Sequence, residues 1–475
     1  MALREPVEIP ALDSLGWTHF INIGGAGMSG VASVLAQSGV PVTGSDPVDT
    51  ASLRVLADQG IATYVGSDVG HLGDARTVVV SSATRADHVE LVEARRRGLR
   101  ILHRSTALAA VVATHRRRIA VGGTHGKTTT TAMTAQVLTG CGLDASFVIG
   151  GTFAATGSGA RLGDGSIIVV EADESDQTFL QYPADIVVVT NVEADHLDNW
   201  GTPERYRAGF VRFVSADQVS CAVVDLDDAG VSDLIVAAPG GGPYTTYGED
   251  AAATVRLAGI CADSDTSTAT VTAGSWTGRL SLQAAGRHNL HNAAAVVTVA
   301  RQLGLDLDRA LAALAEFTGT TRRFQLVGEV AGVRIIDDYA HHPTELRLNI
   351  QAARTVVTER TGRLVVCFQP HLFSRTRDFA AAFGQALAGA DIAVVLGIYP
   401  SREDPLPGVT GRLVADAIPA GAAEVHYVES VSDAAAALAD LVGAGDLVLT
   451  AGAGDVTTVG PQLARLLAGR EEGDP

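Results

Sequence analysis

The sequence predicts an α/β protein of three domains: the first and third are Rossmann-like, and the second has a mixed or parallel sheet with a small antiparallel insertion. Apolar runs of strand length alternate with amphipathic helical stretches along almost the whole chain, which is typical of parallel sheets with helices on both faces. The chain of 475 residues suffices for about three domains of roughly 150 residues each. Its composition, 47% apolar and 19% charged, is typical of a folded protein with buried cores.

The first domain is predicted over residues 1–115. The loop Gly25-Ala-Gly-Met-Ser-Gly30 follows its first strand and opens a helix, and Asp46 comes about one strand-helix-strand unit later. Glycines at such a turn let a diphosphate approach the backbone at a helix N-terminus, so the pattern predicts a dinucleotide or diphosphate site. A tight turn without a ligand is the alternative interpretation. The expected strands of this domain are residues 19–23, 40–44, 77–80 and 100–102.

The second domain is predicted over residues 116–322 and the third over residues 323–475, with the basic stretch His115-Arg-Arg-Arg118 at the first boundary. Short alternating segments with Gly, Thr and Ser from about residue 240 to 282 predict the small antiparallel insertion. The expected strands of the second domain begin at Ile119 and continue with residues 167–170, 186–189 and 222–224. Those of the third domain are residues 333–336, 364–368, 392–396 and 447–449.

Lys127 is the only lysine of the chain, and it lies in Gly123-Thr-His-Gly-Lys-Thr-Thr129, directly after an apolar run. A glycine-rich turn between a strand and a helix points backbone N–H groups and the helix dipole at an anion, and a compact ammonium then contacts terminal phosphates. The wider guanidinium fits such a cradle poorly. Chance placement of one lysine among 35 basic residues is the alternative. Because Val121 stands where the eight-residue P-loop has its first glycine, the match is to the shorter form Gly-x-x-Gly-Lys-Thr.

Two acidic segments follow strands of the same predicted sheet, Glu171-Ala-Asp-Glu-Ser-Asp176 and Asn191-Val-Glu-Ala-Asp-His196. Carboxylates at the C-terminal edge of parallel strands beside a phosphate loop are placed to hold Mg²⁺, which takes oxygen ligands and bridges phosphate oxygens. His196 is an unusual addition to such a set. For any single acid a solvated loop is the alternative, and the clustering of two segments weakens that alternative.

Three further segments contain candidate binding groups. Arg287-His-Asn-Leu-His-Asn292 opens a helix where amides would read an adenine edge, with helix capping by Asn289 as the alternative. Arginines in Thr321-Arg-Arg-Phe324 at the second domain junction would reach a transferring phosphoryl group or form an interdomain salt bridge. In the third domain, the guanidinium of Arg375 or Arg377 suits a carboxylate clamp.

Net charge and cysteine usage exclude several classes of partner. A net charge of −18 argues against nucleic acid or an anionic membrane as the main partner. The four cysteines are far apart and form no metal-spaced pair, which indicates buried thiols in a reducing compartment. The N-terminal residues lack a long apolar core, and no run approaches membrane-spanning length. We therefore expect a cytoplasmic protein that binds small molecules and does not insert into a membrane.

Together these motifs resemble the Mur ligase family, in the branch that adds L-alanine to UDP-N-acetylmuramate. They occur in family order and cover nearly the whole chain, which makes the resemblance specific. The matching segments are Gly24-Gly-Ala-Gly-Met-Ser-Gly30, Gly123-Thr-His-Gly-Lys-Thr-Thr129, Glu171-Ala-Asp-Glu-Ser-Asp176, Asp195-His-Leu-Asp198, His288-Asn-x-x-Asn292, Asp338-Tyr-Ala-His-His-Pro343 and Gly452-Ala-Gly-Asp455.

The resemblance implies a ligase of peptidoglycan precursor synthesis that uses ATP and Mg²⁺, with a UDP-binding first domain, a central P-loop-type ATPase domain, and a third domain that closes over ATP and amino acid. The substrates would be UDP-N-acetylmuramate, L-alanine and ATP, and the enzyme a monomer or dimer. The lactyl carboxylate would be phosphorylated to an acyl phosphate, which the alanine amine then attacks. A base near His196 or within residues 337–342 would take the amine proton.

The resemblance also assigns site residues by matched motif. ATP would be bound by Gly123, Thr124, Gly126, Lys127, Thr128, Thr129, His288, Asn289, Asn292, Arg323 and Asp338. The UDP substrate would be bound by Gly25, Ala26, Gly27, Met28, Ser29, Asp46, His71, Ser81 and Ser82. The amino acid would be bound by Tyr339, His341, Arg375 and Arg377. Magnesium would be bound by Thr128, Glu171 and His196. The catalytic residues would be Lys127, His196, Arg323 and His341.

Two departures and three rival functions accompany this assignment. Many relatives have an arginine where this chain has Leu372, so one cationic contact to the amino acid would be either missing or supplied by Arg377. The absence of a second lysine disfavours the branches that use a carbamylated lysine. A murein peptide recycling ligase, which joins a tripeptide to UDP-N-acetylmuramate, is the nearest rival. A dinucleotide-dependent oxidoreductase would leave the lysine loop without a role, and a nucleotide-sensing protein would leave Glu171 and His196 without one.

Overall fold

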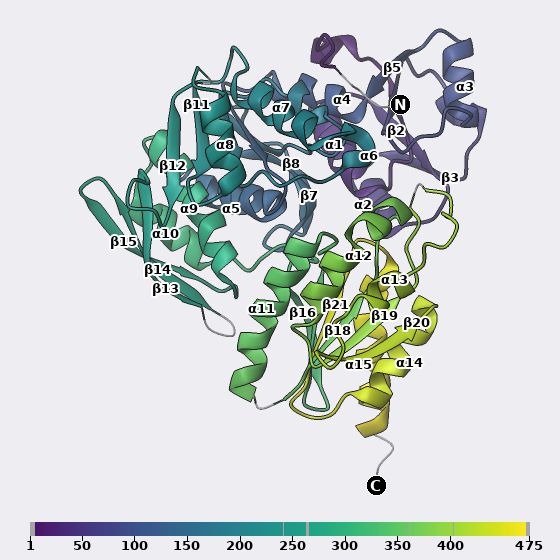
Figure 1. Ribbon diagram of the computed structural model, residues 1–475. Helices are drawn as coiled ribbons and strands as arrows, with labels where there is room; N and C mark the ends of the chain where they lie inside the picture. Colours follow the sequence, from purple (N-terminus) through teal and green to yellow (C-terminus); the bar gives the residue numbers. More distant parts are fainter. Residues whose placement is uncertain (1–4, 241, 263–265, 361, 402, 472–475) are drawn as a thin grey trace. The chain divides into compact units, whose positions relative to one another are not determined.

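The computed structural model describes residues 5–471 apart from 241, 263–265, 361 and 402. Over these residues the chain forms three sheets of five, ten and six strands with helices packed on them, as the sequence predicts for an α/β protein (Figure 1). The described residues fall into two compact units. The described residues of the first unit lie within Met1–Gly259, Ala269–Ser281 and Leu290–Thr318, and those of the second within Ile260–Thr268, Leu282–Asn289 and Gly319–Pro475. None of the described helices has the length and apolar character that a bilayer crossing requires.

The first sheet is parallel throughout its described pairings, with strand order β3-β2-β1-β4-β5. Alternate residues of its strands face different helices, because successive side chains point to opposite faces of a sheet. Phe20 and Val79 share a core with α1 and α4, whereas Ile21 and Val78 pack against α3. The strands are β1 Thr18–Ile21, β2 Val42–Asp46, β3 Ala62–Val65, β4 Thr77–Val80 and β5 Arg100–His103. The helices are η1 Leu12–Ser14, α1 Ala26–Gln37, α2 Ala51–Asp58, η2 Val69–Leu72, α3 Val89–Arg96 and α4 Arg104–Val112.

The second sheet has the order β15-β14-β13-β12-β11-β10-β6-β9-β7-β8. Its central strands β6, β9, β10 and β11 are parallel and rich in buried Val and Ile, which suits strands covered on both faces. The strands are β6 Arg117–Gly122, β7 Ser146–Phe153, β8 Ser158–Arg161, β9 Ile167–Glu171, β10 Ile186–Val189, β11 Cys221–Asp225, β12 Tyr244–Gly248, β13 Val255–Ala262, β14 Ser267–Ala273 and β15 Trp276–Leu282. The helices are α5 Lys127–Gly140, η3 Thr178–Gln181, α6 Leu197–Trp200, α7 Pro203–Val214, α8 Ala229–Ala237, α9 Arg287–Gln302 and α10 Leu307–Ala315.

The region predicted as a small antiparallel insertion differs in one respect from the expectation. Short strands do occupy it, but they extend the second sheet, and β12 lies parallel to β11. The described register between β12 and β13 is also parallel. A described antiparallel pairing lies at the other edge of this sheet, where β7 pairs with β8. The sheet is therefore mixed, as predicted.

The third sheet, in the second unit, has the order β16-β17-β21-β18-β19-β20, and its edge strand β16 is antiparallel to β17. Val366 and Phe368 pack into one core with α11 and α12, while Val365 and Cys367 pack into another with α14 and α15. The strands are β16 Gln325–Val330, β17 Val333–Asp338, β18 Leu364–Phe368, β19 Ile392–Leu396, β20 Glu424–Val428 and β21 Leu447–Ala451. The helices are α11 Pro343–Arg360, α12 Phe373–Leu387, α13 Arg412–Asp416, α14 Val431–Leu441, η4 Asp455–Thr458 and α15 Val459–Glu471.

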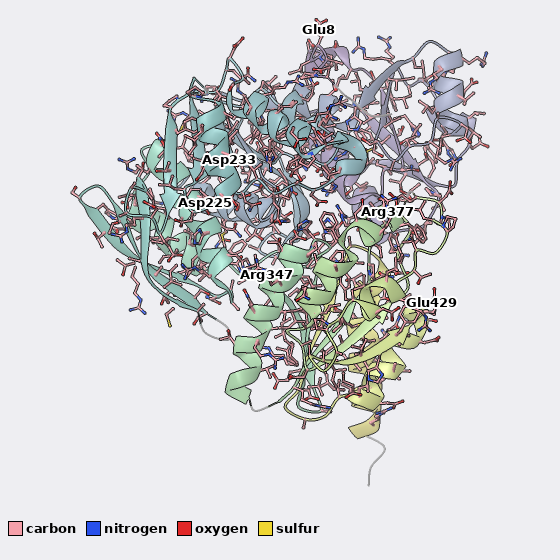
Figure 2. All side chains as sticks on the ribbon, in the orientation of Figure 1. Glu8, Asp225, Asp233, Arg347, Arg377 and Glu429 are labelled. Atoms are coloured by element: carbon pink, nitrogen blue, oxygen red, sulfur yellow. The ribbon has the colours of Figure 1, made fainter. Side chains whose placement is uncertain are left out.

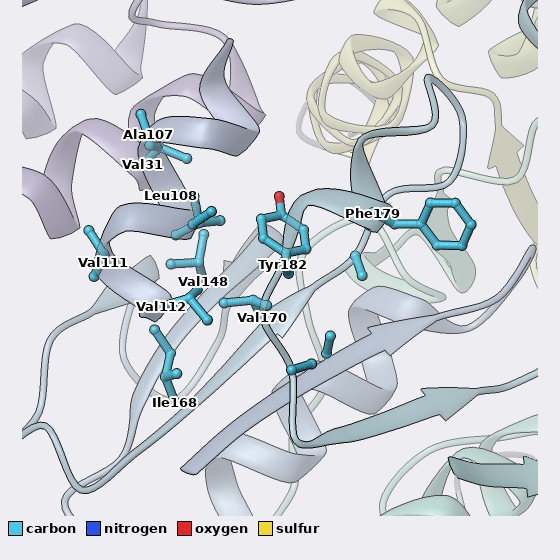
Figure 3. Packing of buried hydrophobic residues seen from close by; sticks show 14 of the residues in the cluster. Val31, Ala107, Leu108, Val111, Val112, Val148, Ile168, Val170, Phe179 and Tyr182 are labelled. Atoms are coloured by element: carbon cyan, nitrogen blue, oxygen red, sulfur yellow. The ribbon is translucent and has the colours of Figure 1, made fainter. Parts of the chain in front are cut away.

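One hydrophobic core joins the first two sheets into a single unit. Val31 of α1 and Leu108 of α4 belong to the same buried cluster as Val148 of β7 and Val170 of β9 (Figure 3). Burying such side chains stabilises the contact by about 1.5–3 kcal/mol each. The N-terminal sheet is thus held against the phosphate-loop sheet by apolar packing.

Candidate functional site

The glycine-rich segment between β6 and α5 forms the predicted strand-turn-helix loop. Gly123 and Gly126 have φ of +132° and +80°, a region that L side chains rarely adopt. A Cβ at Gly123 would lie 2.0 Å from Thr190 Oγ1, and one at Gly126 would lie 2.6 Å from Asn292 Oδ1. Both positions therefore need glycine for space as well as for conformation. Gly126 is the N-cap of α5 and supplies no side-chain cap, so the helix presents its N-terminal amides to the site.

Side chains from the loop after β10 brace this phosphate loop. Asn191 Oδ1 accepts a hydrogen bond from the amide of His125 (2.8 Å), and its Nδ2 donates to the His125 carbonyl (3.1 Å). Thr190 Oγ1 donates to the same carbonyl at 2.6 Å. Thr124 Oγ1 contacts Tyr206 Oη at 2.7 Å. These bonds hold the loop in shape through the neighbouring strand.

The Lys127 ammonium lies inside the loop that it follows. Its Nζ donates to the carbonyls of Gly123 (2.7 Å) and Thr124 (2.8 Å) and lies 2.8 Å from Glu174 Oε2. The sequence placed Glu174 in an acidic segment but gave it no role. Its side chain is fully buried, so the residue is a functional candidate that sequence reasoning missed.

Burial and neighbouring charges shift the pKa values of this group. Burial raises the pKa of Glu174 to about 8, although the Lys127 ammonium opposes the rise. Burial lowers the pKa of Lys127, but Glu174 and Asp173 outweigh it and raise that pKa above its ordinary value. Burial likewise opposes ionisation of Asp173, yet Arg104 and Lys127 hold its pKa below the usual range. These shifts favour the charged forms of Lys127 and Asp173 and the protonated form of the Glu174 carboxyl near neutral pH.

Two of the three predicted magnesium ligands lie together. Thr128 Oγ1 donates to Glu171 Oε1 at 3.0 Å, and Glu171 Oε2 accepts from the Gly150 amide at 2.7 Å. The described ion-pair contacts of His196 are instead with Asp195 Oδ2 (3.4 Å) and Glu174 Oε1 (3.7 Å). The oxygens of Thr128 and Glu171 suit Mg²⁺, which prefers oxygen ligands.

The glycine loop of the N-terminal sheet also opens a helix without a side-chain cap. Gly25 is the N-cap of α1, and Asp46 Oδ2 accepts the Gly24 amide at 3.0 Å. Asp46 therefore fixes the loop itself. A Cβ at Gly27 would lie 2.8 Å from Nη1 of Arg104, whose Nη2 donates to Asp173 Oδ2 at 2.9 Å. Arg104, which sequence reasoning missed, thus connects this loop to the acidic segment after β9.

The other predicted UDP-site residues make contacts within the first unit. His71 Nδ1 lies 3.1 Å from Glu90 Oε1, and its ring stacks on Tyr64 with centroids 4.4 Å apart. Ser82 Oγ donates to Asp176 Oδ2 at 2.5 Å, and the Ser81 amide donates to a threonine hydroxyl. Glu90 is fully buried and also accepts from Ser45. It is a second residue whose position the sequence did not reveal.

The second unit brings together most of the residues predicted to bind the amino acid and ribose. Asp338 accepts the amides of Phe324 and Ala340, both at 2.6 Å, and burial raises its pKa to about 6 against the charge of Arg323. The Arg323 guanidinium lies 5.2 Å from the ring centroid of Tyr339. The Tyr339 and His341 rings are 5.3 Å apart.

The two candidate clamp arginines differ in their surroundings. The ring of His341 is 6.0 Å from that of His371, whose Nδ1 lies 3.4 Å from Nη1 of the buried Arg375. The exposed Arg377 instead pairs with Asp378 at 2.7 Å (labelled in Figure 2). The structure therefore groups Arg375, and not Arg377, with the predicted amino-acid residues.

Helix α9 carries the predicted adenine residues. His288 and Asn289 lie in its first turn, and Asn289 Nδ2 donates to the Ala285 carbonyl at 2.8 Å. Because this amide donates and does not accept, the bond is not an N-cap of the usual kind. Asn292 lies against Gly126 of the phosphate loop.

Comparisons with known proteins agree on one family. The chain matches the sequence profiles described as "Mur ligase family, catalytic domain" over residues 18–116, "Mur ligase middle domain" over 121–300 and "Mur ligase, glutamate ligase domain" over 322–454. A UDP-N-acetylmuramate–L-alanine ligase of Cutibacterium acnes is 56% identical over 99% of this chain and 100% of that one. One of Kineococcus radiotolerans is 51% identical over 96% and 97%.

Solved structures give the same result. The UDP-N-acetylmuramate-alanine ligase of Thermotoga maritima superposes with a TM-score of 0.81 at 30% identity, covering 96% of this chain and 99% of that one. A murein peptide ligase of Psychrobacter arcticus has a TM-score of 0.73 at 24% identity, covering 95% and 99%, and shows the shared fold alone. The chain belongs to the Mur ligase family, as the sequence motifs predict.

Proposed function

We propose that this chain joins L-alanine to the lactyl carboxylate of UDP-N-acetylmuramate, at the expense of ATP. Full-length identity of 56% to a ligase of that name supports the substrates. The observation that carries the nucleotide part is the phosphate loop, in which the Lys127 ammonium stands among carbonyl and carboxylate oxygens before an uncapped helix. A triphosphate would replace those oxygens as its partner.

The chemistry needs an activated carboxylate, because a carboxylate anion is a poor electrophile. Attack of a lactyl oxygen on the γ-phosphorus of ATP forms an acyl phosphate and releases ADP. The alanine amine then attacks the acyl carbon, inorganic phosphate leaves, and the amine loses a proton. Lys127 and Arg323 would neutralise the developing charge on the phosphoryl oxygens, so catalysis is mainly positioning and electrostatic stabilisation.

The magnesium part of the proposal rests on Thr128 and Glu171, whose oxygens lie 3.0 Å apart beside the loop. Thr128 and Glu171 would hold Mg²⁺ there, and the ion would supply Lewis-acid polarisation to the phosphoryl group. His196, whose Nε2 lies 3.7 Å from Glu174 Oε1, is one candidate to hold the proton that the amine releases. His341, in the second unit, is the other candidate.

We further propose roles for the remaining predicted residues. Gly25 to Ser29 with His71, Ser81 and Ser82 would form the UDP site, with Asp46 fixing its loop. Asn292, His288 and Asn289 would face adenine, Asp338 the ribose, and Tyr339, His341 and Arg375 the amino acid. The domain limits of residues 1–115, 116–322 and 323–475, and the cytoplasmic location, belong to the same proposal.

The test is phosphate release from ATP in the presence of UDP-N-acetylmuramate and single amino acids. Turnover with L-alanine, followed by mass-spectrometric detection of the amide product, is the expected result. Turnover with a preformed tripeptide but not with L-alanine would reject this function in favour of a murein peptide recycling ligase. NAD-dependent oxidation without ATP turnover would reject the family's chemistry for this chain altogether.

A further inference from the structure

His291 of helix α9 lies between two carboxylates that come from other elements. Its Nδ1 is 2.8 Å from Oδ2 of Asp225, the last residue of β11, and its Nε2 is 3.1 Å from Oε1 of Glu249, which follows β12. Figure 2 labels Asp225 in this part of the chain. The ring therefore connects α9 to the C-terminal ends of two neighbouring strands.

Both ring nitrogens must carry hydrogen to satisfy this arrangement. Ionised carboxylate oxygens only accept hydrogen bonds, so a ring between two of them donates from both nitrogens and is an imidazolium. Burial opposes this charge, but the hydrogen bonds and charges of Asp225 and Glu249 outweigh burial and raise the pKa of His291 above its ordinary value. Asp227 is a third carboxylate nearby, with an oxygen within 4.8 Å of an Asp225 oxygen and of a His291 ring nitrogen.

The carboxylates around His291 are themselves tied to the backbone. Asp225 Oδ1 accepts the Asp227 amide at 3.0 Å, and Asp227 accepts the amides of Glu249 and Asp250. Asp228, next in the same turn, accepts the Val192 amide at 3.1 Å. Val192 follows Asn191, which braces the phosphate loop. The turn after β11 thus connects His291 to the segment whose Asn191 hydrogen-bonds the phosphate loop.

Helix α9 reaches the phosphate loop through the residue after His291. Asn292 Oδ1 would be only 2.6 Å from a Cβ at Gly126, the N-cap of α5. A small displacement of the first turns of α9 would therefore either press Asn292 into Gly126 or separate the two. What fixes α9 at His291 also fixes this distance.

We propose that His291 is a positioning residue for the nucleotide: its imidazolium pins α9 to Asp225 and Glu249, holds Asn292 against the phosphate loop, and makes nucleotide affinity decrease with rising pH. The inference rests on the proposed function in that ATP occupies this loop. It adds a residue and a pH dependence that the proposed chemistry does not require.

The sign of the pH effect follows from the raised pKa of His291. The clamp is complete below the ordinary histidine value of about 6.5 and is lost as the pH rises through the higher folded-state pKa. A neutral ring keeps only one N–H. Its other nitrogen then has a lone pair facing a carboxylate oxygen, and that hydrogen bond is lost. The titratable groups facing the ring are Asp225, Asp227 and Glu249, while the described bonds of Asp228 and Arg256 here are to backbone atoms.

Isothermal titration of the full chain with ADP and Mg²⁺, between pH 6.5 and 9, tests the proposal without needing turnover. Wild-type affinity should decrease with pH, whereas His291→Gln should bind about tenfold more weakly at pH 6.5 and show a flatter profile. The nucleotide's own titration is common to both proteins and cancels in the ratio. In steady state, the KM for ATP should rise while the KM for UDP-N-acetylmuramate stays within about twofold.

Two further variants provide a second test of the clamp and a matched control. Glu249→Gln removes one carboxylate at a partly exposed position and should move the midpoint of the affinity profile to lower pH. His115→Gln is the matched control, because that histidine is buried with partners on both nitrogens, Val111 O and Ser146 Oγ, on a different segment. It should leave the profile unchanged.

Equal ADP affinity in wild type and His291→Gln, or an unmoved midpoint in Glu249→Gln, would overturn the positioning role. If the chain binds ADP with the expected pH profile but does not ligate L-alanine, the proposed function fails while the role of His291 stands. If the chain ligates L-alanine and both variants bind ADP like wild type, the proposed function stands and the role of His291 fails. The two conclusions are therefore separable in one set of proteins.

Discussion

Replacing Lys127 with arginine keeps the charge of the phosphate loop but changes its shape. Lysine Nζ lies 2.7 and 2.8 Å from two loop carbonyls and 2.8 Å from Glu174 Oε2, with a side chain only 14% exposed. A guanidinium has its donors spread over a wider plane and cannot make this three-oxygen contact from the same position. Losing one pre-positioned donor to a transferring phosphoryl group costs about 3–4 kcal/mol at the transition state, a 10²–10³-fold loss of rate.

The assay for Lys127→Arg is phosphate release at saturating substrates, with UDP-N-acetylmuramate binding measured separately by calorimetry. We expect turnover to decrease at least about 100-fold, and UDP-substrate affinity to stay within about twofold, because arginine preserves the positive charge that faces Glu174 and Asp173. Arg96→Lys, a swap in an exposed ion pair with Glu93 on α3, is the control. Turnover of Lys127→Arg within about fivefold of wild type would refute the phosphate-clamp argument.

Three further predictions follow from the same site and its supports. Gly126→Ala should raise the KM for ATP about tenfold, because an alanine in the left-handed region costs about 1–2 kcal/mol and its Cβ would contact Asn292. An unchanged KM would contradict the close approach of Asn292 to Gly126. Burial raises the pKa of Glu90, but bonds from His19 and Ser45 outweigh it and hold that pKa at about 2 against an ordinary 4.5. The ionised Glu90 carboxylate therefore contributes about 3 kcal/mol to the free energy of unfolding above pH 4.5. This contribution is lost as the pH decreases toward 2. The thermal destabilisation by Glu90→Gln should be large at pH 7 and about half as large at pH 3, and an equal effect at both would count against this account. Chelation with EDTA should stop phosphate release, and Glu171→Gln should raise the Mg²⁺ needed for half-maximal rate at least about tenfold; an unchanged requirement would remove Glu171 from the metal site.

The strands most accurately predicted are those whose local sequence leaves no alternative. Residues 77–80, 186–189, 364–368 and 392–396 form strands with the predicted limits, because each is a short run rich in valine and other apolar residues, bounded by polar or turn-forming residues. The edge strands β3 and β16 were not predicted. Their side chains are largely exposed or half-buried, so they lack the apolar pattern by which a strand is recognised.

The site was predictable where a motif is contiguous and unpredictable where folding brings distant residues together. The lysine loop could be read from its own motif, and the resemblance to the Mur ligase family singled out Thr128 and Glu171 beside it. Arg104 meets Asp173, 69 positions away, and only the packing of α1 and α4 on β7 and β9 makes that contact. Arg375 and Arg377 looked equivalent in sequence, but two positions along a helix point in nearly opposite directions, so one is buried and the other pairs at the surface.

A chain with one lysine offers a chemical probe of its own active loop. Amine-selective acylating reagents have only Lys127 and the α-amino group to modify, and peptide mapping separates the two products. Because the Lys127 side chain is only 14% exposed, its acylation rate reports how often the loop opens to the reagent. Slower labelling with added nucleotide would then give a footprint of occupancy at a single atom, in wild-type protein and without any engineered tag.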